Sequence, residues 1–201
     1  MPRRPATPAD RRTAHAPHEV RIIGGQWRRT KLPVIDKPGL RPTPDRVRET
    51  LFNWLGQDLT GWRCIDAFAG TGALGLEAAS RGAAEVLLVE QDAGLARQLQ
   101  VLKERLQAQA VQVRRGDGVA ALAARPAGSA DLVLLDPPFD AQALFAPALA
   151  AAARAVRPTG FVYLEAPATW DAAALASAGL APHRHMKAGA VHAHLLVPTC
   201  A

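Results

Sequence analysis

The chain has 201 residues, which is enough for one α/β domain with a sizeable core and too few for two domains of ordinary size. No apolar run approaches the roughly 18 residues that a membrane-spanning helix needs, and the arginine-rich first twenty residues lack the apolar block of a signal peptide. We therefore expect a soluble, cytoplasmic protein without a membrane partner. Two cysteines, Cys64 and Cys200, predict neither a disulfide framework nor a zinc site.

The net charge of +6 is concentrated at the start of the chain. Residues 1–48 hold 12 of the 24 Lys and Arg residues but 4 of the 18 Asp and Glu residues, so the remainder is slightly acidic. A basic segment attached to a nearly neutral domain is typical of nucleic-acid-binding proteins, because phosphates neutralised by the protein release counterions. The alternative is a solvated tail that only aids solubility.

The first elements of the chain predict a small N-terminal extension. Residues 1–18 mix Pro, Arg and Ala without apolar periodicity, which predicts a disordered basic tail. Order should begin at Glu19, with a short strand pair that turns at Gly24 and Gly25. We assign residues 19–60 to this extension and residues 61–201 to the main domain.

A helix should close the extension, with Thr43 as its N-cap and Pro44 at its first position. Its expected apolar face consists of Val47, Leu51, Trp54 and Leu55, and it should end at Gly56.

From Trp62 onward, strand-like and helix-like segments alternate, which predicts a parallel sheet with helices on both faces. The expected strands are 63–67, 85–90, 110–114, 131–135 and 160–165, and the expected helices are 73–81, 92–108, 117–124, 141–156 and 170–178. Two last strands, 180–186 and 191–198, have no helix between them and should form an antiparallel hairpin at the sheet edge.

The loop after the first of these strands contains Gly-Thr-Gly-Ala-Leu-Gly, a pattern often found at dinucleotide pyrophosphates. Asp66 precedes Gly70 by four residues, and its carboxylate would repel a pyrophosphate while suiting a cationic ligand. In a parallel sheet the ligand lies outside the carboxyl ends of the strands. Acids are expected at or near every one of these ends: Asp66, Glu90, Asp117, Asp136 and Glu165.

The segment Asp-Pro-Pro-Phe, residues 136–139, predicts a socket for a planar amine. Two prolines stiffen the turn and leave the carbonyl of Pro137 available as an acceptor beside Asp136. An exocyclic base amine could donate one hydrogen to each, while Phe139 stacks on the ring. The alternative is a plain strand-to-helix turn in which Asp136 caps the next helix.

Together these motifs resemble the class I S-adenosylmethionine-dependent amino-methyltransferases. Phe-Ala-Gly-Thr-Gly-Ala-Leu-Gly resembles their motif I, Glu90 motif II, Asp117 motif III and Asp-Pro-Pro-Phe motif IV. With the N-terminal segments RIIGGQWRRTKLP and LRPTPDRVRETLFNWL, the chain from about Val20 is similar to the RsmD family, whose members methylate the N2 amine of one guanine in bacterial 16S ribosomal RNA. The resemblance implies a Rossmann-like, seven-stranded class I methyltransferase sheet that is mostly parallel and carries the antiparallel C-terminal hairpin.

The resemblance also implies roles for individual residues. The catalytic residues it implies are those of the socket: Asp136, Pro137, Pro138 and Phe139. S-adenosylmethionine should be bound by Asp66, Phe68, Gly70, Gly72, Glu90, Gln91, Asp117 and Gly118, with Thr43 and Arg46 closing over its methionine end. RNA should be contacted by Arg21, Arg28, Arg29, Lys31 and Arg41. An N-cap and a solvated helix face remain alternatives for Thr43 and Arg46.

The implied partner is 16S rRNA, within a partly or fully assembled small ribosomal subunit, and the protein is expected to act as a monomer. No metal is expected: His183, His185, His192 and His194 fall on paired strands without acidic or cysteine ligands, so we interpret them as edge-strand residues.

Three other functions remain open, namely a DNA adenine-N6 methyltransferase, a nicotinamide-dependent dehydrogenase and a non-catalytic rRNA-binding assembly factor. Asp66 argues against the second, and the set of Asp66, Glu90 and Asp136 argues against the third.

Overall fold

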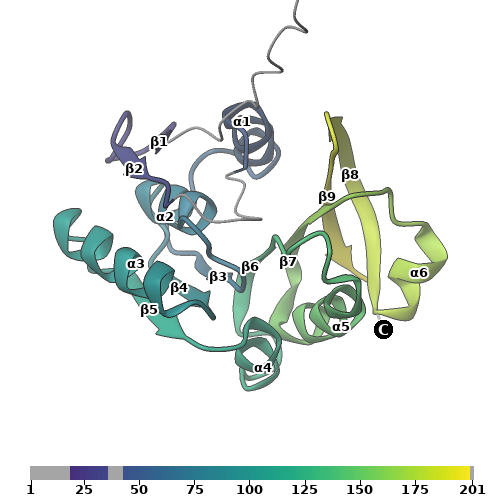
Figure 1. Ribbon diagram of the computed structural model, residues 1–201. Helices are drawn as coiled ribbons and strands as arrows, with labels where there is room; N and C mark the ends of the chain where they lie inside the picture. The colour runs from purple at the N-terminus through teal and green to yellow at the C-terminus, as the bar shows by residue number, and fades with distance from the viewer. Residues whose placement is uncertain (1–18, 36–42, 200–201) are drawn as a thin grey trace, which may run out of the picture.

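The computed structural model describes residues 19–35 and 43–199 and arranges the alternating segments as three layers, with a sheet between two sets of helices (Figure 1). The sheet has seven strands in the order β5-β4-β3-β6-β7-β9-β8. Pairing is parallel from β5 to β7, and β9 is antiparallel to both β7 and β8. The predicted fold class is thereby confirmed. The strands are β3 (Arg63–Asp66), β4 (Glu85–Glu90), β5 (Val111–Arg115), β6 (Ala130–Leu135), β7 (Val156–Ala166), β8 (Leu180–Ala188) and β9 (Val191–Pro198).

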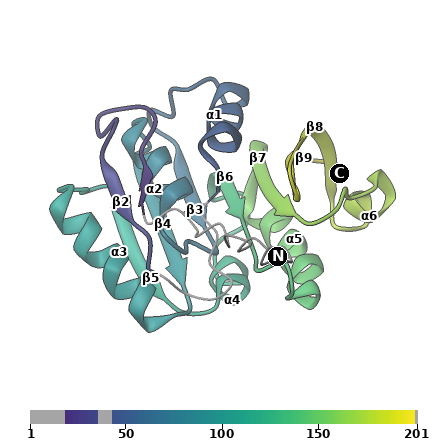
Figure 2. The same ribbon diagram turned by 45° about the horizontal axis from the view of Figure 1, so that its top comes forward.

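Helices cover both faces of the sheet, as Figures 1 and 2 show. One face packs against α1 (Asp45–Trp54), α2 (Ala73–Ser80) and α3 (Ala93–Arg105), through a core that includes Leu51, Leu76 and Leu99. The other packs against α4 (Gly118–Ala123), α5 (Phe145–Ala155) and α6 (Ala172–Ser177). Because its two faces are both covered, β6 is buried along its whole length, which explains its continuous apolar run.

The N-terminal strands β1 (Glu19–Arg21) and β2 (Lys31–Pro33) form the expected antiparallel pair beside α2 (Figure 2). The chain reverses between Ile22 and Arg29, a stretch that includes the predicted Gly24 and Gly25, but the tight turn lies later than predicted, at residues 26–29. The glycines instead lie against the end of α2, where the Gln26 amide donates to the Ser80 carbonyl at 2.8 Å. A Cβ on Gly25, whose φ is +75°, would lie 1.8 Å from that carbonyl oxygen, so glycine is required for close approach.

Every predicted helix differs from the observed one at an end or at both ends: α2 by one residue at its C-terminus, α4 by one at each end, α3 by one at its N-terminus and three at its C-terminus, and the others as follows. Pro44, rather than Thr43, is the N-cap of α1, and no side chain caps this helix. The expected helix 141–156 is a 3₁₀ turn, η1 (Gln142–Leu144), followed by α5, and its last residue already belongs to β7. The helix expected from residue 170 begins at Ala172, which leaves Trp170 in the preceding loop.

Strand β7 is longer than predicted and begins at Val156. It continues through Pro158 and Gly160, with a register irregularity opposite Ala130 and Leu132 of β6. The predicted tail, residues 1–18, and the predicted RNA contact Arg41 lie outside the described residues.

Candidate active site

The strand order reverses between β3 and β6, which makes the carboxyl ends of these two strands the expected ligand crevice. The parallel strands bring the predicted acids together in the order of the strands, from β5 to β7. Asp117 follows β5, Glu90 ends β4, Asp66 ends β3, Asp136 follows β6, and Glu165 lies near the end of β7. A row of five carboxyl groups therefore follows this edge of the sheet.

Asp66 is buried at the end of β3, with its side chain beneath the glycine loop. Its Oδ2 accepts a hydrogen bond from the Gly75 amide at 3.0 Å. The Phe68 amide lies near enough to lower the pKa of Asp66, but within the described chain no donor reaches Oδ1 with hydrogen-bonding geometry. Burial raises the pKa of Asp66 to about 7, and the neighbouring carboxyl groups of Glu90 and Glu165 contribute to this shift.

Asp136 and Glu165 lie side by side on neighbouring strands, because Leu135 of β6 pairs with Leu164 of β7. Glu165 is 2 % exposed, and its Oε1 accepts a hydrogen bond from the Tyr163 hydroxyl at 2.9 Å. Burial raises the pKa of Glu165 to about 7. Burial, followed by the charges of Glu165 and Asp66, holds the pKa of Asp136 well above its usual range. Three carboxyl groups this close cannot all be ionised unless positive charge is brought to them.

Thr43 lies over this carboxyl pair. Its Oγ1 is 3.5 Å from Asp136 Oδ2, and a hydrogen bond from the same hydroxyl lowers the pKa of Glu165. Thr43 is buried although it precedes α1. The structure thus brings Thr43 to the predicted site, whereas Arg46 is exposed on α1.

The glycine loop uses its own backbone amides internally. Gly70 donates to Glu90 Oε2 at 2.8 Å, and Gly72 donates to the Ala69 carbonyl at 2.6 Å. Since Gly75 donates to Asp66, the amides of all three glycines in the pattern are engaged within the protein, which disfavours a pyrophosphate there. Both Gly70 and Gly72 have positive φ values, of 51° and 80°, so the loop depends on glycine at these positions.

The remaining predicted cofactor contacts lie on both sides of this loop. Glu90 is partly exposed and also accepts from the Asp92 amide at 2.7 Å. Asp117 is exposed and caps α4, because its Oδ1 accepts a hydrogen bond from the Ala120 amide. Capping uses this one oxygen and does not require Oδ2. Gln91 is exposed, Phe68 is partly buried, and a Cβ on Gly118 would lie 2.0 Å from the Ala67 carbonyl oxygen.

The Asp-Pro-Pro-Phe loop leads from β6 into η1. Pro138 accepts a hydrogen bond from the Ala141 amide at 2.9 Å, whereas no described donor reaches the carbonyl of Pro137. Phe139 is partly buried against the core on the α5 side, and its carbonyl accepts from the Gln142 side chain at 2.8 Å. An acceptor carbonyl and a carboxyl group thus lie in consecutive residues beside a partly exposed ring.

The predicted RNA contacts that are described occupy the N-terminal strand pair and its turn. Arg21 is paired with Asp45 at 2.8 Å, and Lys31 with Glu19 at 2.7 Å. Arg28 and Arg29 are exposed in the turn and form no ion pair with the residues that the structure describes.

A buried charge cluster, which the sequence did not predict, holds this N-terminal strand pair to the domain. Glu77 of α2 accepts hydrogen bonds from the amides of Ile23 and Gly24, at 2.7 and 2.8 Å. It also pairs with Arg48 at 3.2 Å and with Arg81 at 2.8 Å. Arg48 is fully buried and donates in addition to the Thr43 carbonyl at 3.2 Å, so the cluster fixes the backbone that presents Thr43. An arginine on the apolar face of the predicted helix was the available signal.

In the described part of the chain, no helix is long and apolar enough to cross a membrane. Across the same residues, no group of three or more His, Cys, Asp or Glu side chains is arranged to hold a metal ion.

Comparison with known proteins confirms the family suggested by the motifs. The family model described as Conserved hypothetical protein 95 matches residues 20–197. Ribosomal RNA small subunit methyltransferase D of Escherichia coli is 50 % identical over 121 residues, which cover 60 % of this chain and 61 % of that protein. The Haemophilus influenzae protein of the same name is 46 % identical over 132 residues, covering 63 % of this chain and 67 % of the relative. The aligned stretch is thus about three fifths of the E. coli relative's length.

Solved structures extend the likeness over nearly the whole chain. A candidate methyltransferase from E. coli, yhhF, superposes with a TM-score of 0.76 at 36 % identity, covering 90 % of this chain and 98 % of that one. A candidate methylase from H. influenzae, HI0767, gives a TM-score of 0.72 at 31 % identity, with 90 % and 98 % coverage. The fold is therefore that of a Rossmann-like class I methyltransferase.

Proposed function

Since the chain belongs to the family described as Conserved hypothetical protein 95, the RsmD family, we propose that it transfers a methyl group from S-adenosylmethionine to the N2 amine of a guanine in small-subunit ribosomal RNA. The observation that carries the proposal is the trio of the buried Asp66 and Glu165 and the partly buried Asp136. These carboxyl groups have raised or strongly raised pKa values in the protein alone, so the crevice favours a ligand that brings positive charge. S-adenosylmethionine carries an ammonium and a sulfonium group.

The residues fit this cofactor in two further respects. The unpartnered Oδ1 of Asp66 is a buried acceptor that an ammonium group would satisfy. Glu90 retains lone pairs for ribose hydroxyls after accepting from Gly70 and Asp92. When bound, the sulfonium supplies an activated methyl group with a good leaving group behind it.

The chain's own contribution to the chemistry is to orient the base and balance its charge. Asp136 and the Pro137 carbonyl accept the two hydrogens of the guanine amine, which directs the nitrogen lone pair toward the methyl group. Phe139 stacks on the ring. Positive charge grows on the nitrogen during transfer and is stabilised by Asp136, after which water takes the released proton. Thr43, held by the Glu77 and Arg48 cluster, keeps the carboxyl pair in position.

The direct test of this function is methylation in vitro. The protein is incubated with S-adenosylmethionine and with small-subunit particles from a strain that lacks the gene, and with naked 16S rRNA from the same strain. We expect mass spectrometry of digested RNA to find N2-methylguanosine at one position. Methylated adenine in a DNA control would favour the adenine-N6 alternative, and rRNA binding without any methylation would favour the assembly-factor alternative.

Cofactor affinity should depend on pH through Asp66. An acid whose pKa is raised to about 7 is protonated in the free protein at lower pH, and a ligand whose ammonium group binds this carboxylate must displace that proton. We therefore expect the affinity for S-adenosylhomocysteine, measured by calorimetry, to fall by up to about tenfold per pH unit below pH 7. The Asp66→Asn variant should bind more weakly at pH 8 and show a shallower pH dependence.

The control for this experiment is Glu49→Gln, which alters an exposed carboxylate on α1. It should preserve both the affinity and its pH dependence. An affinity that is flat from pH 5 to pH 8 in the parent protein would contradict the role given to Asp66.

RNA affinity should depend on the turn of the N-terminal strand pair. Replacing Arg28 and Arg29 with Glu should weaken binding to 16S rRNA and reduce the slope of log affinity against log salt by about one unit per lost phosphate contact. Affinity for S-adenosylhomocysteine should stay unchanged. Arg114→Glu, an exposed position on β5 outside the proposed contact surface, is the control. An unchanged slope in the double variant would remove Arg28 and Arg29 from the RNA surface.

A further inference from the structure

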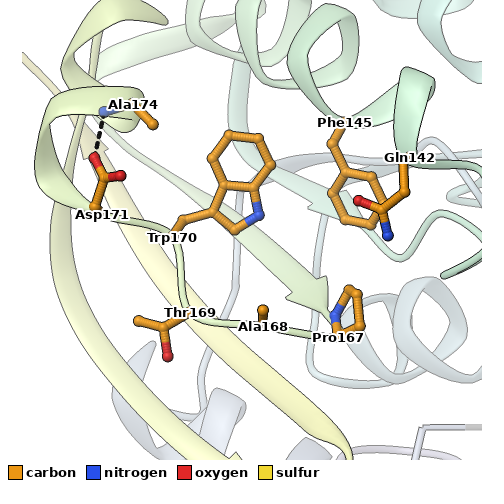
Figure 3. Close-up of a pocket in the computed structure, with 8 residues that line it drawn as sticks. All are labelled: Gln142, Phe145, Pro167, Ala168, Thr169, Trp170, Asp171 and Ala174. Atoms are coloured by element: carbon orange, nitrogen blue, oxygen red, sulfur yellow. Dashed lines mark hydrogen bonds between the residues drawn. The ribbon is translucent and has the colours of Figure 1, made fainter.

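A cavity outside the proposed reaction site is formed by the loop that follows β7, residues 167–171, and by Gln142 and Phe145 (Figure 3). Its volume is about 240 Å³. Trp170 and Phe145 form its aromatic wall, with ring centroids 6.0 Å apart and planes 24° apart. The polar side chains of Gln142, Thr169 and Asp171 also line the cavity, and Pro167 closes one side. A drug-sized ligand usually needs about 300 Å³ or more, so this cavity suits one planar ring system.

The histidines of the C-terminal hairpin hold the loop that forms one wall of the cavity. His192 Nδ1 is 2.8 Å from the Thr169 hydroxyl, and His194 Nε2 accepts from the Trp170 amide at 3.3 Å. His194 is 2 % exposed, and burial lowers its pKa to about 4, so its imidazole is neutral and available as an acceptor at neutral pH. These histidines, interpreted from the sequence as ordinary edge-strand residues, therefore fix the position of Trp170.

The cavity is connected to the proposed reaction site on two sides. Gln142 lines the cavity and donates to the carbonyl of Phe139, the proposed stacking residue. Pro167 follows β7 directly, two residues beyond Glu165, which lies next to Asp136. A chain of nucleotides that placed one base over Phe139 would bring its neighbour to this cavity.

One cationic side chain, that of Lys187, adjoins the cavity wall, while desolvation and the neighbouring Lys187 and His185 lower the pKa of His192 and favour its neutral form. Lys187 of β8 is opposite His192 of β9, and His185 is opposite His194, so in this antiparallel pair the four side chains share one face of the hairpin. His185 Nε2 is 3.2 Å from His192 Nδ1, the atom that also contacts Thr169. Lys187 and His185 are exposed. Asp171 also lines the cavity, two residues beyond Thr169, and caps α6 through an oxygen that accepts from the Ala174 amide.

We propose that this cavity binds the base of a nucleotide adjacent to the target guanine, stacked on Trp170, with its phosphate against the face formed by Lys187, His185 and His192. The inference rests on the proposed function and adds a specificity subsite to it. Aromatic stacking accepts any base, while the Gln142 amide, the Thr169 hydroxyl and the Asp171 carboxylate offer hydrogen bonds to a base edge. The subsite would help keep the target nucleotide out of its stack, because the neighbouring base gains a partner in the protein.

The test compares two tryptophans in the same assay. Trp170→Ala should raise KM for small-subunit particles by about fivefold to a hundredfold with a small change in kcat, since stacking acts on bound RNA before and during the reaction. Trp62→Ala is the matched control: Trp62 is also partly buried and stacked on a phenylalanine, Phe161, at 6.2 Å, but it lies at the opposite, amino end of β3. It should leave KM within about twofold. Trp170→Phe should restore most of the parent KM.

A second measurement separates this inference from the proposed function. Short single-stranded RNA of mixed sequence should quench tryptophan fluorescence of the parent protein, and Trp170→Phe should lose most of that quenching while keeping normal affinity for S-adenosylhomocysteine. Methylation by the parent, together with an unaltered KM in Trp170→Ala and unaltered quenching in Trp170→Phe, would overturn the subsite alone. If Trp170→Ala raised KM for assembled particles but not for naked rRNA, the subsite would also be overturned, because that result would indicate that the cavity binds a ribosomal protein. Absence of methylation by the parent would overturn the proposed function.

Discussion

Replacing Asp136 with Ala should lower kcat for rRNA methylation by about a hundredfold to a thousandfold while KM changes little. The proposed role of Asp136 is to balance positive charge that grows on the guanine nitrogen only as the methyl group arrives, so its loss affects the transition state more than the bound substrate. Removal of one preorganised electrostatic partner in an active site typically costs this much. Single-turnover methylation of small-subunit particles measures the effect.

The controls use the same loop and the same assay. Asp140→Ala removes an exposed carboxylate four residues along the loop and should keep the parent rate. Asp136→Asn retains an acceptor oxygen without the charge and should fall between the parent and Asp136→Ala. All variants should bind S-adenosylhomocysteine. If Asp136→Ala methylates at nearly the parent rate, the socket does not supply the electrostatic stabilisation proposed for it.

Replacing Glu77 with Ala should lower the free energy of unfolding by about 3 to 5 kcal/mol, as expected when one partner of a buried ion pair is removed. Glu77 is fully buried and receives hydrogen bonds from two backbone amides and from Arg48 and Arg81. Its loss leaves the fully buried Arg48 with Asp45 as its remaining ionic partner. Urea denaturation, followed by circular dichroism, measures the change.

Glu85→Ala is the control for this stability effect. Glu85 is also paired with an arginine, Arg125, but at 3.6 Å and with about a third of each side chain exposed, so less than about 1 kcal/mol should be lost. Glu77→Ala should also weaken cofactor binding, because Arg48 holds the backbone of Thr43 through its carbonyl. A loss in Glu77→Ala no larger than that in Glu85→Ala would show that the cluster does not anchor the N-terminal strand pair.

The central elements were predictable because their residue patterns reflect local physics. Strands β4 and β9 match the predicted ranges 85–90 and 191–198, and β3, β5 and β6 differ from theirs by one residue at an end or at both ends, whereas β7 begins four residues early and β8 ends two residues late. Their apolar runs are buried on both faces, which leaves little ambiguity in pattern or period. The acids at the carboxyl ends of the strands followed from the same assignment, since parallel pairing places those ends at one edge.

Features that depend on distant partners were not predictable from the sequence. Thr43 is a residue type that often caps helices, yet its hydroxyl lies 3.5 Å from the carboxyl group of Asp136, which is 93 residues later in the sequence. Arg48 occupies an apolar helix face because Glu77, 29 residues later, neutralises it there. Strand β7 passes through Pro158 and Gly160, two residues that usually interrupt strands, because the irregular pairing with β6 accommodates them. Local propensity contains no information about such contacts.

The position of β9 within the sheet has a consequence for the order in which the protein can fold. Strand β9 is later in sequence than β8 but lies between β8 and β7, where Leu195 and Leu196 are fully buried. Until residues 191–198 have been synthesised, β7 has one open edge and β8 has no strand to join. Strand β7, which contributes Glu165, therefore acquires its second neighbour last. That neighbour, β9, pairs with β8 close by in the sequence, whereas β3 to β6 lie far earlier in the chain. During translation, the half of the crevice that contains the glycine loop can therefore form first, and the half proposed to receive the base is complete only when β9 inserts.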